Sequence, residues 1–319
     1  MNAQKLDLSV IIPVYNDAAA LALFLPQLFT RLQHFAGEHE LVVVDDGSKD
    51  DLETVFREHT ARLPENCRAR LVRFSRNFGK EAALSAGLAQ AQGEAVVMMD
   101  ADGQHPVELL AKMRELILSG NDMVAAVQSS RELESWGKRA GKRWFYRLIQ
   151  DSDRFEITPG AGDFRMMSRR VVDALNRLPE RKRFMKGLYA WVGFPTVYLP
   201  FAAEERLAGA SKFGYRQLFG LALTGFTAFS TRPLRWVSHI GLLVSLFALI
   251  YAAYVVIETL FLGKHLPGWP TLAAGMMLFS GVQLICLGVI GEYIGNIYTE
   301  VKQRPPYIID SIEHSDEAA

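Results

Sequence analysis

The chain has little cysteine and no excess of charge of either sign. Its 319 residues include two cysteines, Cys67 and Cys286, and 35 basic side chains balance 35 acidic ones. Two cysteines so far apart are too few for a disulfide framework or a zinc site, so we expect the polar part of the chain to face a reducing cytosol. Balanced charge gives no reason to expect a nucleic-acid partner.

A cleavable signal peptide and internal repeats are also missing from the pattern. The opening residues are polar, and the first apolar run, residues 10–12, has the length of a short strand. A secretory signal needs a longer apolar segment behind a basic start. We therefore expect no cleaved leader.

Long hydrophobic runs are present near the carboxyl end. Half of all residues are hydrophobic, which is high for a soluble protein. Residues 240–257 and 272–290 carry almost no charge, and each run approaches the roughly 20 residues that a helix needs to cross a bilayer. The short link between them contains glycine and proline. This pattern predicts a membrane-spanning helical hairpin; two buried core helices are the less favoured interpretation, because core helices rarely lack charge on every face.

Basic side chains flank the predicted hairpin. They are Arg232, Arg235 and His239 before it and Lys302 and Arg304 after it, against Lys264 and His265 in the link. By the positive-inside rule both ends face the cytoplasm. Residues 215–229 have apolar positions at helical spacing but too few to span, which predicts an interfacial helix or, alternatively, a core helix. The acidic tail after Ile309 is predicted to be disordered.

The amino-terminal part follows a β-α-β pattern. Apolar runs at residues 8–14 and 40–45 end in polar residues and enclose a helical segment, residues 18–35. Residues 71–74 predict a third strand and residues 80–92 a helix. Near-continuous apolar strands are typical of a parallel sheet covered on both faces, and ligands bind such sheets outside the carboxyl ends of the strands. The sequence predicts an α/β nucleotide-binding domain.

Two carboxylates follow the apolar run at residues 95–99. Asp100 and Asp102 are separated by one residue at the point where the run enters a polar turn. A short pair of this kind suits Mg²⁺ or Mn²⁺, because these ions take oxygen ligands and are completed by water and substrate phosphates. Two turn-forming aspartates without a metal are the alternative interpretation.

Five motifs occur in a characteristic order. They are residues 9–16 (SVIIPVYN), 44–48 (VDDGS), 77–80 (NFGK), 100–106 (DADGQHP) and 162–165 (GDFR). With the apolar hairpin, they resemble glycosyltransferase family 2, which has the GT-A fold, and within it the bacterial polyprenyl-phosphate glycosyltransferases. The resemblance extends from about residue 6 to 309. One departure is Gly103, where many relatives have leucine.

The resemblance implies a donor site for a UDP-sugar. Asp46, with Asp45 and Tyr15, is expected to hold the uridine, and Asp100 and Asp102 the metal. The full predicted donor set is Pro13, Tyr15, Asn16, Asp45, Asp46, Lys80, Asp100, Ala101, Asp102 and Gln104. His105 is either near the donor phosphates or structural.

Two basic segments are candidates for binding an acceptor phosphate. Residues 137–147 place Lys138, Arg139, Lys142 and Arg143 largely on one helical face, with aromatic residues suited to a membrane interface; a solvated basic face is the alternative. By resemblance, Arg206, Ser211 and Lys212 belong to a loop that closes over the phosphates, and Gly209 gives it freedom to move. A plain surface turn is the alternative there.

The resemblance also assigns catalytic positions. Asp163 falls where the family has its proposed base, and Asp102, Arg206 and Lys212 complete the predicted catalytic set. A phosphate monoester loses its second proton at about pH 6, so the acceptor needs little help from a base. Asp163 is therefore also a candidate for orienting the acceptor or a sugar hydroxyl, paired with Arg165.

The resemblance implies inverting transfer of a hexose, glucose before others, from a UDP-sugar to undecaprenyl phosphate at the bacterial inner membrane. Transfer of mannose, N-acetylglucosamine or amino-arabinose and a non-catalytic nucleotide-binding scaffold are the alternatives. We expect a homo-oligomer, a tetramer by resemblance. The predicted divisions are a catalytic domain at 1–214, a juxtamembrane helix at 215–235, the hairpin at 236–292 and a cytoplasmic tail at 293–319.

Overall fold

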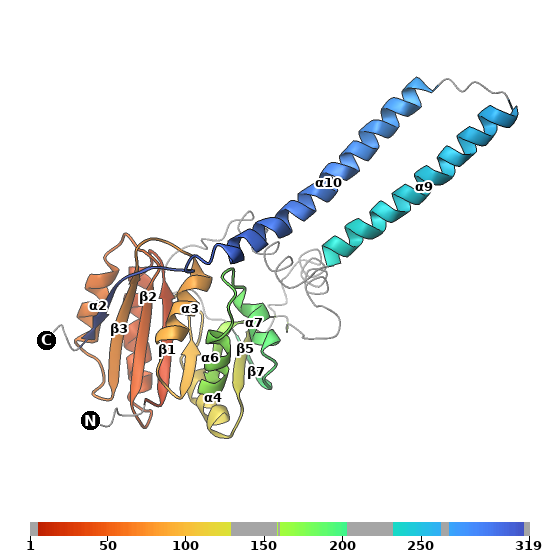
Figure 1. Ribbon diagram of the computed structural model, residues 1–319. Helices are drawn as coiled ribbons and strands as arrows, with labels where there is room; N and C mark the ends of the chain where they lie inside the picture. Colours follow the sequence, from red (N-terminus) through yellow and green to blue (C-terminus); the bar gives the residue numbers. More distant parts are fainter. Residues whose placement is uncertain (1–5, 129–157, 159, 203–231, 263–267, 316–319) are drawn as a thin grey trace.

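The computed structural model describes residues 6–128, 158, 160–202, 232–262 and 268–315 (Figure 1). Within these ranges the chain forms an eight-stranded sheet with the order β7-β5-β6-β4-β1-β2-β3-β8. The strands are β1 (Leu8–Val14), β2 (His39–Asp45), β3 (Cys67–Phe74), β4 (Ala95–Met98), β5 (Met123–Gln128), β6 (Ala161–Ser168), β7 (Thr196–Phe201) and β8 (Ile309–His314).

Helices connect and cover these strands. They are α1 (Ala18–Leu32), α2 (Leu52–Thr60), α3 (Lys80–Gln90), α4 (Leu109–Leu118), α6 (Arg169–Asn176) and α7 (Met185–Trp191), followed by the long helices α9 (Arg232–Leu262) and α10 (Trp269–Val301). The predicted β-α-β unit is confirmed as β1, α1 and β2. The central strands β4, β1, β2 and β3 are parallel, whereas β6 and β8 run in the opposite direction.

Both faces of the sheet are buried, which explains the unbroken apolar runs. Alternate residues of a strand point to opposite faces. Val10 and Ile12 of β1 lie in the core beneath α1, α2 and α4, whereas Ile11 lies in the core beneath α3, α6 and α7. All three side chains are fully buried. The middle of β1 therefore carries apolar residues facing both sides, as a doubly covered parallel sheet requires.

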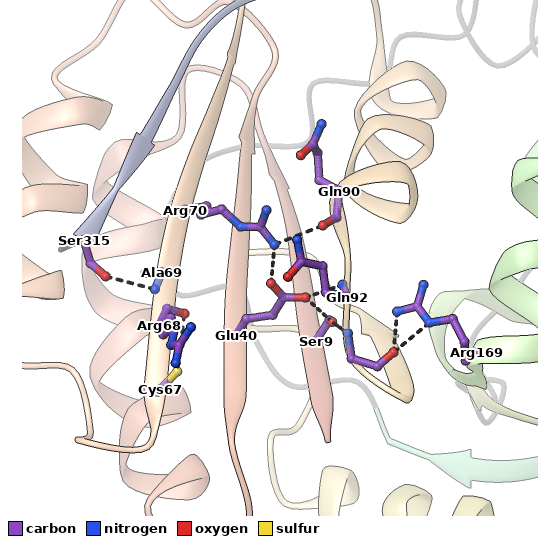
Figure 2. Close-up of polar contacts among 11 residues, drawn as sticks. Ser9, Glu40, Cys67, Arg68, Ala69, Arg70, Gln90, Gln92, Arg169 and Ser315 are labelled. Carbon is purple, nitrogen blue, oxygen red and sulfur yellow. Dashed lines mark hydrogen bonds and ion pairs between the residues drawn. The ribbon is translucent and has the colours of Figure 1, made fainter. Parts of the chain in front are cut away.

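A buried polar network closes the edge of the sheet where β1 and β2 begin (Figure 2). The Glu40 carboxylate accepts hydrogen bonds from Ser9 Oγ and from the backbone N–H of Gln92, both at 2.5 Å, and pairs with the Arg70 guanidinium. Ser9 Oγ in turn accepts from the backbone N–H of Gly93 at 2.7 Å. One carboxylate thus ties three strands to the turn between α3 and β4.

The two long helices form a pair that extends away from the sheet (Figure 1). Each contains a segment long and apolar enough to cross a membrane, Leu234–Val255 in α9 and Gly275–Val301 in α10, and the apolar windows are not buried among the described residues. Leu242 is 68% exposed and Met277 76% exposed. The interpretation as buried core helices is therefore wrong. Helices α9 and α10 are both longer than the apolar runs predicted at residues 240–257 and 272–290. The predicted interfacial helix at 215–229 lies outside the described residues.

The prediction of a disordered tail after Ile309 is wrong for residues 309–314. They form β8, which pairs antiparallel with β3, from Phe74 opposite Ile309 to Arg70 opposite His314. Ser315 Oγ accepts from the Ala69 backbone N–H at 3.2 Å, and Glu313 pairs with Arg57 at 3.1 Å. Composition alone suggested disorder, but the exposed edge of β3 offers backbone partners to a short alternating strand.

Replacing Glu40 with alanine should lower the free energy of unfolding of the sheet domain by about 3–5 kcal/mol, because it leaves the buried Arg70 guanidinium without its counter-charge. Chemical denaturation followed by tryptophan fluorescence measures this loss. The control is Glu115→Ala, which breaks only the exposed pair with Lys112 and should change the stability little. Equal effects of the two substitutions would refute the assigned importance of the network.

Candidate active site

The predicted donor residues gather at one edge of the sheet. The carboxyl ends of β1, β2 and β4 meet there because these strands are parallel, and they lead into Tyr15, Asp46 and Asp100. Strand β6 runs antiparallel to β4, with Arg165 opposite Met98. Asp163 lies two residues before Arg165, and Asp100 lies two residues after Met98. The antiparallel register therefore brings Asp163 and Asp100 to the same edge of the sheet.

Asp46 fixes the loop that precedes α3. Its carboxylate is 3% exposed and accepts the backbone N–H groups of Phe78 at 2.6 Å and Gly79 at 2.9 Å. Burial raises the pKa of Asp46, and the two N–H groups act against that rise. Gly47 has φ of +70°, and a Cβ there would lie 2.4 Å from the backbone carbonyl carbon of Arg76. Only glycine permits this close approach of the two loops.

The neighbouring residues shape the wall of the same region. Asp45 accepts from the backbone N–H of Ser48 at 2.7 Å and lies 3.4 Å from the Arg73 guanidinium. Asn16 accepts from the backbone N–H of Lys49 at 2.7 Å, while the side chain of Tyr15 is 39% exposed. Asp45 and Asp46 therefore hold protein backbone in this structure, and their contact with uridine stays a prediction, as does that of Pro13.

A lysine joins the two carboxylates at the centre of this edge. Lys80 Nζ lies 2.6 Å from Asp100 Oδ1 and 3.5 Å from Asp163 Oδ2. Burial lowers the pKa of Lys80, but Asp100 and Asp163 outweigh that effect and the net shift is upward. Burial likewise raises the pKa of Asp100, and Lys80 reverses the shift. The three groups form one partly buried charge cluster.

Asp163 retains unused hydrogen-bonding capacity. Its Oδ1 is buried without a hydrogen-bond partner among the described residues, which is unusual for a carboxylate. The predicted pairing with Arg165 is not formed within the described structure: that guanidinium donates to the Gly162 carbonyl at 2.7 Å and lies over the Tyr189 ring at 3.6 Å. The Arg165 side chain lies against Tyr189 of α7, and Lys80 supplies the ion pair to Asp163.

The turn after β4 is rigidly built. Asp102 Oδ1 accepts the backbone N–H of Gln104 at 3.1 Å, and Gly103 takes φ of +75°, which leucine in that position would adopt with strain. His105 Nδ1 accepts the backbone N–H of Asp100 at 3.0 Å, and its ring stacks on Phe164. Burial lowers the pKa of His105. These contacts support the structural interpretation of His105. Ala101, in the same turn, is buried.

Asp100 and Asp102 fit a cation to which the protein supplies only some of the ligands. Among the described residues no group of three or more His, Cys, Asp or Glu side chains could hold a metal. Asp100 and Asp102 supply hard oxygen ligands, but Asp100 is also paired with Lys80. Such a donor set suits Mg²⁺ or Mn²⁺ completed by water and phosphate oxygens, and it does not suit a structural zinc site.

Comparison with known proteins identifies the family. Residues 9–175, more than half of the chain, match the model for glycosyl transferase family 2. The chain belongs to glycosyltransferase family 2. It is accordingly an enzyme with the GT-A fold, as the resemblance predicted. Residues 232–297, which include most of α9 and α10, match the GtrB C-terminal hairpin.

Individual known proteins are similar along nearly the whole chain. The SfII prophage-derived bactoprenol glucosyl transferase of Shigella flexneri is 43% identical over 307 residues, covering 95% of this chain and 97% of its own. A prophage bactoprenol glucosyl transferase homolog of Escherichia coli (strain K12) is 40% identical over 311 residues, covering 96% and 99%. The solved mannosyltransferase PcManGT of Pyrobaculum calidifontis, in complex with GDP-Man and Mn²⁺, is 20% identical with a TM-score of 0.48, covering 94% and 88%.

Several predicted site residues lie outside the described part of this family member. They are Lys138, Arg139, Lys142, Arg143, Arg206, Ser211 and Lys212, and their roles stay predictions. Conversely, Glu81 was not among the predicted residues; it accepts the backbone N–H of Met185 at 3.0 Å and so ties α7 to the first turn of α3. Its position directly after Lys80, at the start of an apolar helix, was the available signal.

Glu81 should make stability depend on pH. Burial and the nearby Asp163 raise its pKa from 4.5 to about 7. A carboxyl that binds its proton more tightly when folded adds stability below about pH 4.5, and this contribution is lost as the pH rises through about 7. Glu81→Gln removes the titration and keeps an acceptor for Met185.

The thermal unfolding midpoint of Glu81→Gln, relative to the unsubstituted protein, should therefore rise between pH 5 and pH 8. Fluorescence-monitored melts at each pH measure it, with the exposed Glu115→Gln as control. If the unfolding midpoints of the unsubstituted protein and of Glu81→Gln change in parallel with pH, the raised pKa assigned to Glu81 is wrong.

Proposed function

We propose that this glycosyltransferase transfers glucose from UDP-glucose to undecaprenyl phosphate, with inversion at the anomeric carbon, on the cytoplasmic leaflet of a bacterial inner membrane. The similarity to bactoprenol glucosyl transferases carries this proposal, because 40–43% identity extends over at least 95% of both chains, hairpin included. A shared hairpin matters because the acceptor is a membrane lipid.

The acceptor phosphate is the nucleophile in this reaction. Its monoester is mostly doubly ionised near neutral pH, so an oxygen attacks the anomeric carbon directly while the bond to UDP breaks on the opposite side. Asp163 then serves to position the acceptor or a sugar hydroxyl: its buried Oδ1 has no hydrogen-bond partner among the described residues, and Lys80 keeps the carboxylate charge compensated. Positioning of this kind needs no proton transfer to Asp163.

Negative charge on the departing UDP is stabilised by cations. Lys80 is placed at this edge by α3, and Arg206 and Lys212 are the predicted phosphate ligands outside the described residues. Asp102, together with Asp100, would hold Mg²⁺ or Mn²⁺, which when bound neutralises charge on the diphosphate. Preorganised charge at a leaving group is commonly the largest catalytic contribution.

The chain path supports placing both ends of the hairpin on one side of the membrane. The sheet domain precedes α9, and β8 after α10 rejoins the same sheet through β3. Two crossings return the chain to the side from which it left. The basic flanks of the hairpin favour the cytoplasm for that side, where nucleotide sugars are available.

Assay of transfer tests the proposal directly. The detergent-purified protein should convert undecaprenyl phosphate and UDP-glucose into one lipid-phase product in Mn²⁺, and EDTA should abolish product formation. Parallel reactions with UDP-linked N-acetylglucosamine and amino-arabinose and with a mannose donor distinguish the alternative sugars. UDP binding without product from any donor would favour the non-catalytic scaffold instead.

Asp102→Asn should abolish turnover while the protein still folds, because the amide removes the charge that a divalent cation requires. Product formation and the unfolding midpoint are measured together. The matched control is Asp51→Asn, an exposed aspartate at the start of α2, which should retain full activity. A near-native rate for the Asp102 variant would refute the metal assignment.

A further inference from the structure

The segment after the hairpin is attached to the catalytic domain from its first residues. Near the end of α10, the Glu300 carboxylate accepts the backbone N–H groups of Arg181 at 3.0 Å and Lys182 at 3.3 Å. Lys182 Nζ donates to Asn296 Oδ1 at 3.0 Å. From there the chain leads into β8, which pairs with β3 (Figure 1). The exit from the membrane hairpin is therefore fixed at the edge of the sheet that holds the candidate site.

Tyr307 and Ile308 of this segment contact the end of β3 and the loop at residues 75–79 that follows it. The Tyr307 ring stacks on Phe74, with centroids 5.0 Å apart and planes at 7°, and Phe74 packs edge-on against Phe78 at 5.8 Å. The Ile308 carbonyl accepts the backbone N–H of Ser75 at 3.1 Å. Tyr307 and Phe78 also pack against the same buried core. The tail is thus joined to the loop indirectly, from Tyr307 through Phe74 to Phe78, and directly by the Ile308–Ser75 hydrogen bond.

This loop is the one that Asp46 holds from the opposite side. The Asp46 carboxylate accepts the N–H groups of Phe78 and Gly79, and the next residue is Lys80, which lies between Asp100 and Asp163. The position of Lys80 therefore depends on the position of Gly79, the last residue of the loop. Contacts from Asp46 and from the tail together hold the loop in place.

We propose that Tyr307 is a positioning residue for the donor: its ring supports Phe74, which packs against Phe78, so that Phe78 and Gly79 stay against Asp46 and Lys80 is placed for binding the UDP diphosphate. This inference rests on the proposed use of UDP-glucose. Because the aromatic stack is made by the ring and not by the hydroxyl, phenylalanine at this position should suffice. Strand β8, which begins two residues later, attaches through backbone pairing and through side chains further from the site, such as Glu313 on Arg57.

The test compares donor and acceptor constants in the full-length protein in detergent. Tyr307→Ala should raise the KM for UDP-glucose and the Kd for UDP in Mn²⁺ about 3- to 10-fold, the contribution expected of one aromatic pair. The KM for undecaprenyl phosphate should stay unchanged. Tyr307→Phe should behave as the unsubstituted protein, and Glu313→Gln, which weakens the far end of β8, serves as the matched control.

Each other outcome has a defined meaning. Unchanged donor constants in Tyr307→Ala, or equal loss of donor and acceptor affinity in step with a lower unfolding midpoint, would overturn the inference. If the alanine variant does not fold, Tyr307→Leu fills the space without an aromatic face and should show the same selective loss. An unsubstituted protein that binds UDP but makes no glucosyl lipid refutes the proposed function, and the UDP Kd values still decide the role of Tyr307; failure to bind UDP refutes both.

Discussion

The candidate site depends on the two hydrogen bonds that Asp46 accepts from the loop before α3. A buried carboxylate is costly to desolvate, and backbone N–H groups from Phe78 and Gly79 compensate that cost. The interaction joins the end of β2 to the start of α3, and Gly47 permits the approach. Because Lys80 follows immediately, its contacts with Asp100 and Asp163 are a consequence of this junction.

The two edges of the sheet use buried charge differently. At the edge where β1 and β2 begin, Glu40 has its oxygens matched by Ser9, Gln92 and Arg70 (Figure 2). At the site edge, Lys80 is shared between two carboxylates, and one oxygen of Asp163 is left without a partner among the described residues. A satisfied network contributes to stability, whereas incomplete satisfaction at the other edge leaves groups available for a ligand.

The membrane hairpin is inserted into the catalytic fold instead of following it. Strand β8 comes after α10 yet extends the sheet beside β3, so residues on both sides of the hairpin in sequence build one domain. The Glu300 contacts place the end of α10 against residues 181 and 182. The proposed transfer requires a lipid acceptor and a nucleotide-sugar donor to meet at one place, and this connectivity keeps the hairpin close to the site edge.

The sequence by itself determined the local features: the β-α-β unit, the apolar pair of helices, and the polar residues at the strand ends. Each depends on side-chain period or on neighbours within a few residues, which the chain order displays directly. Only the tertiary structure decided that Asp163 lies beside Lys80 and not Arg165, that Glu81 caps α7, and that residues 309–314 form a strand. Those contacts join residues about 80 to 250 positions apart, and they exist only once the packed sheet has brought both partners to the same edge, which no local pattern encodes.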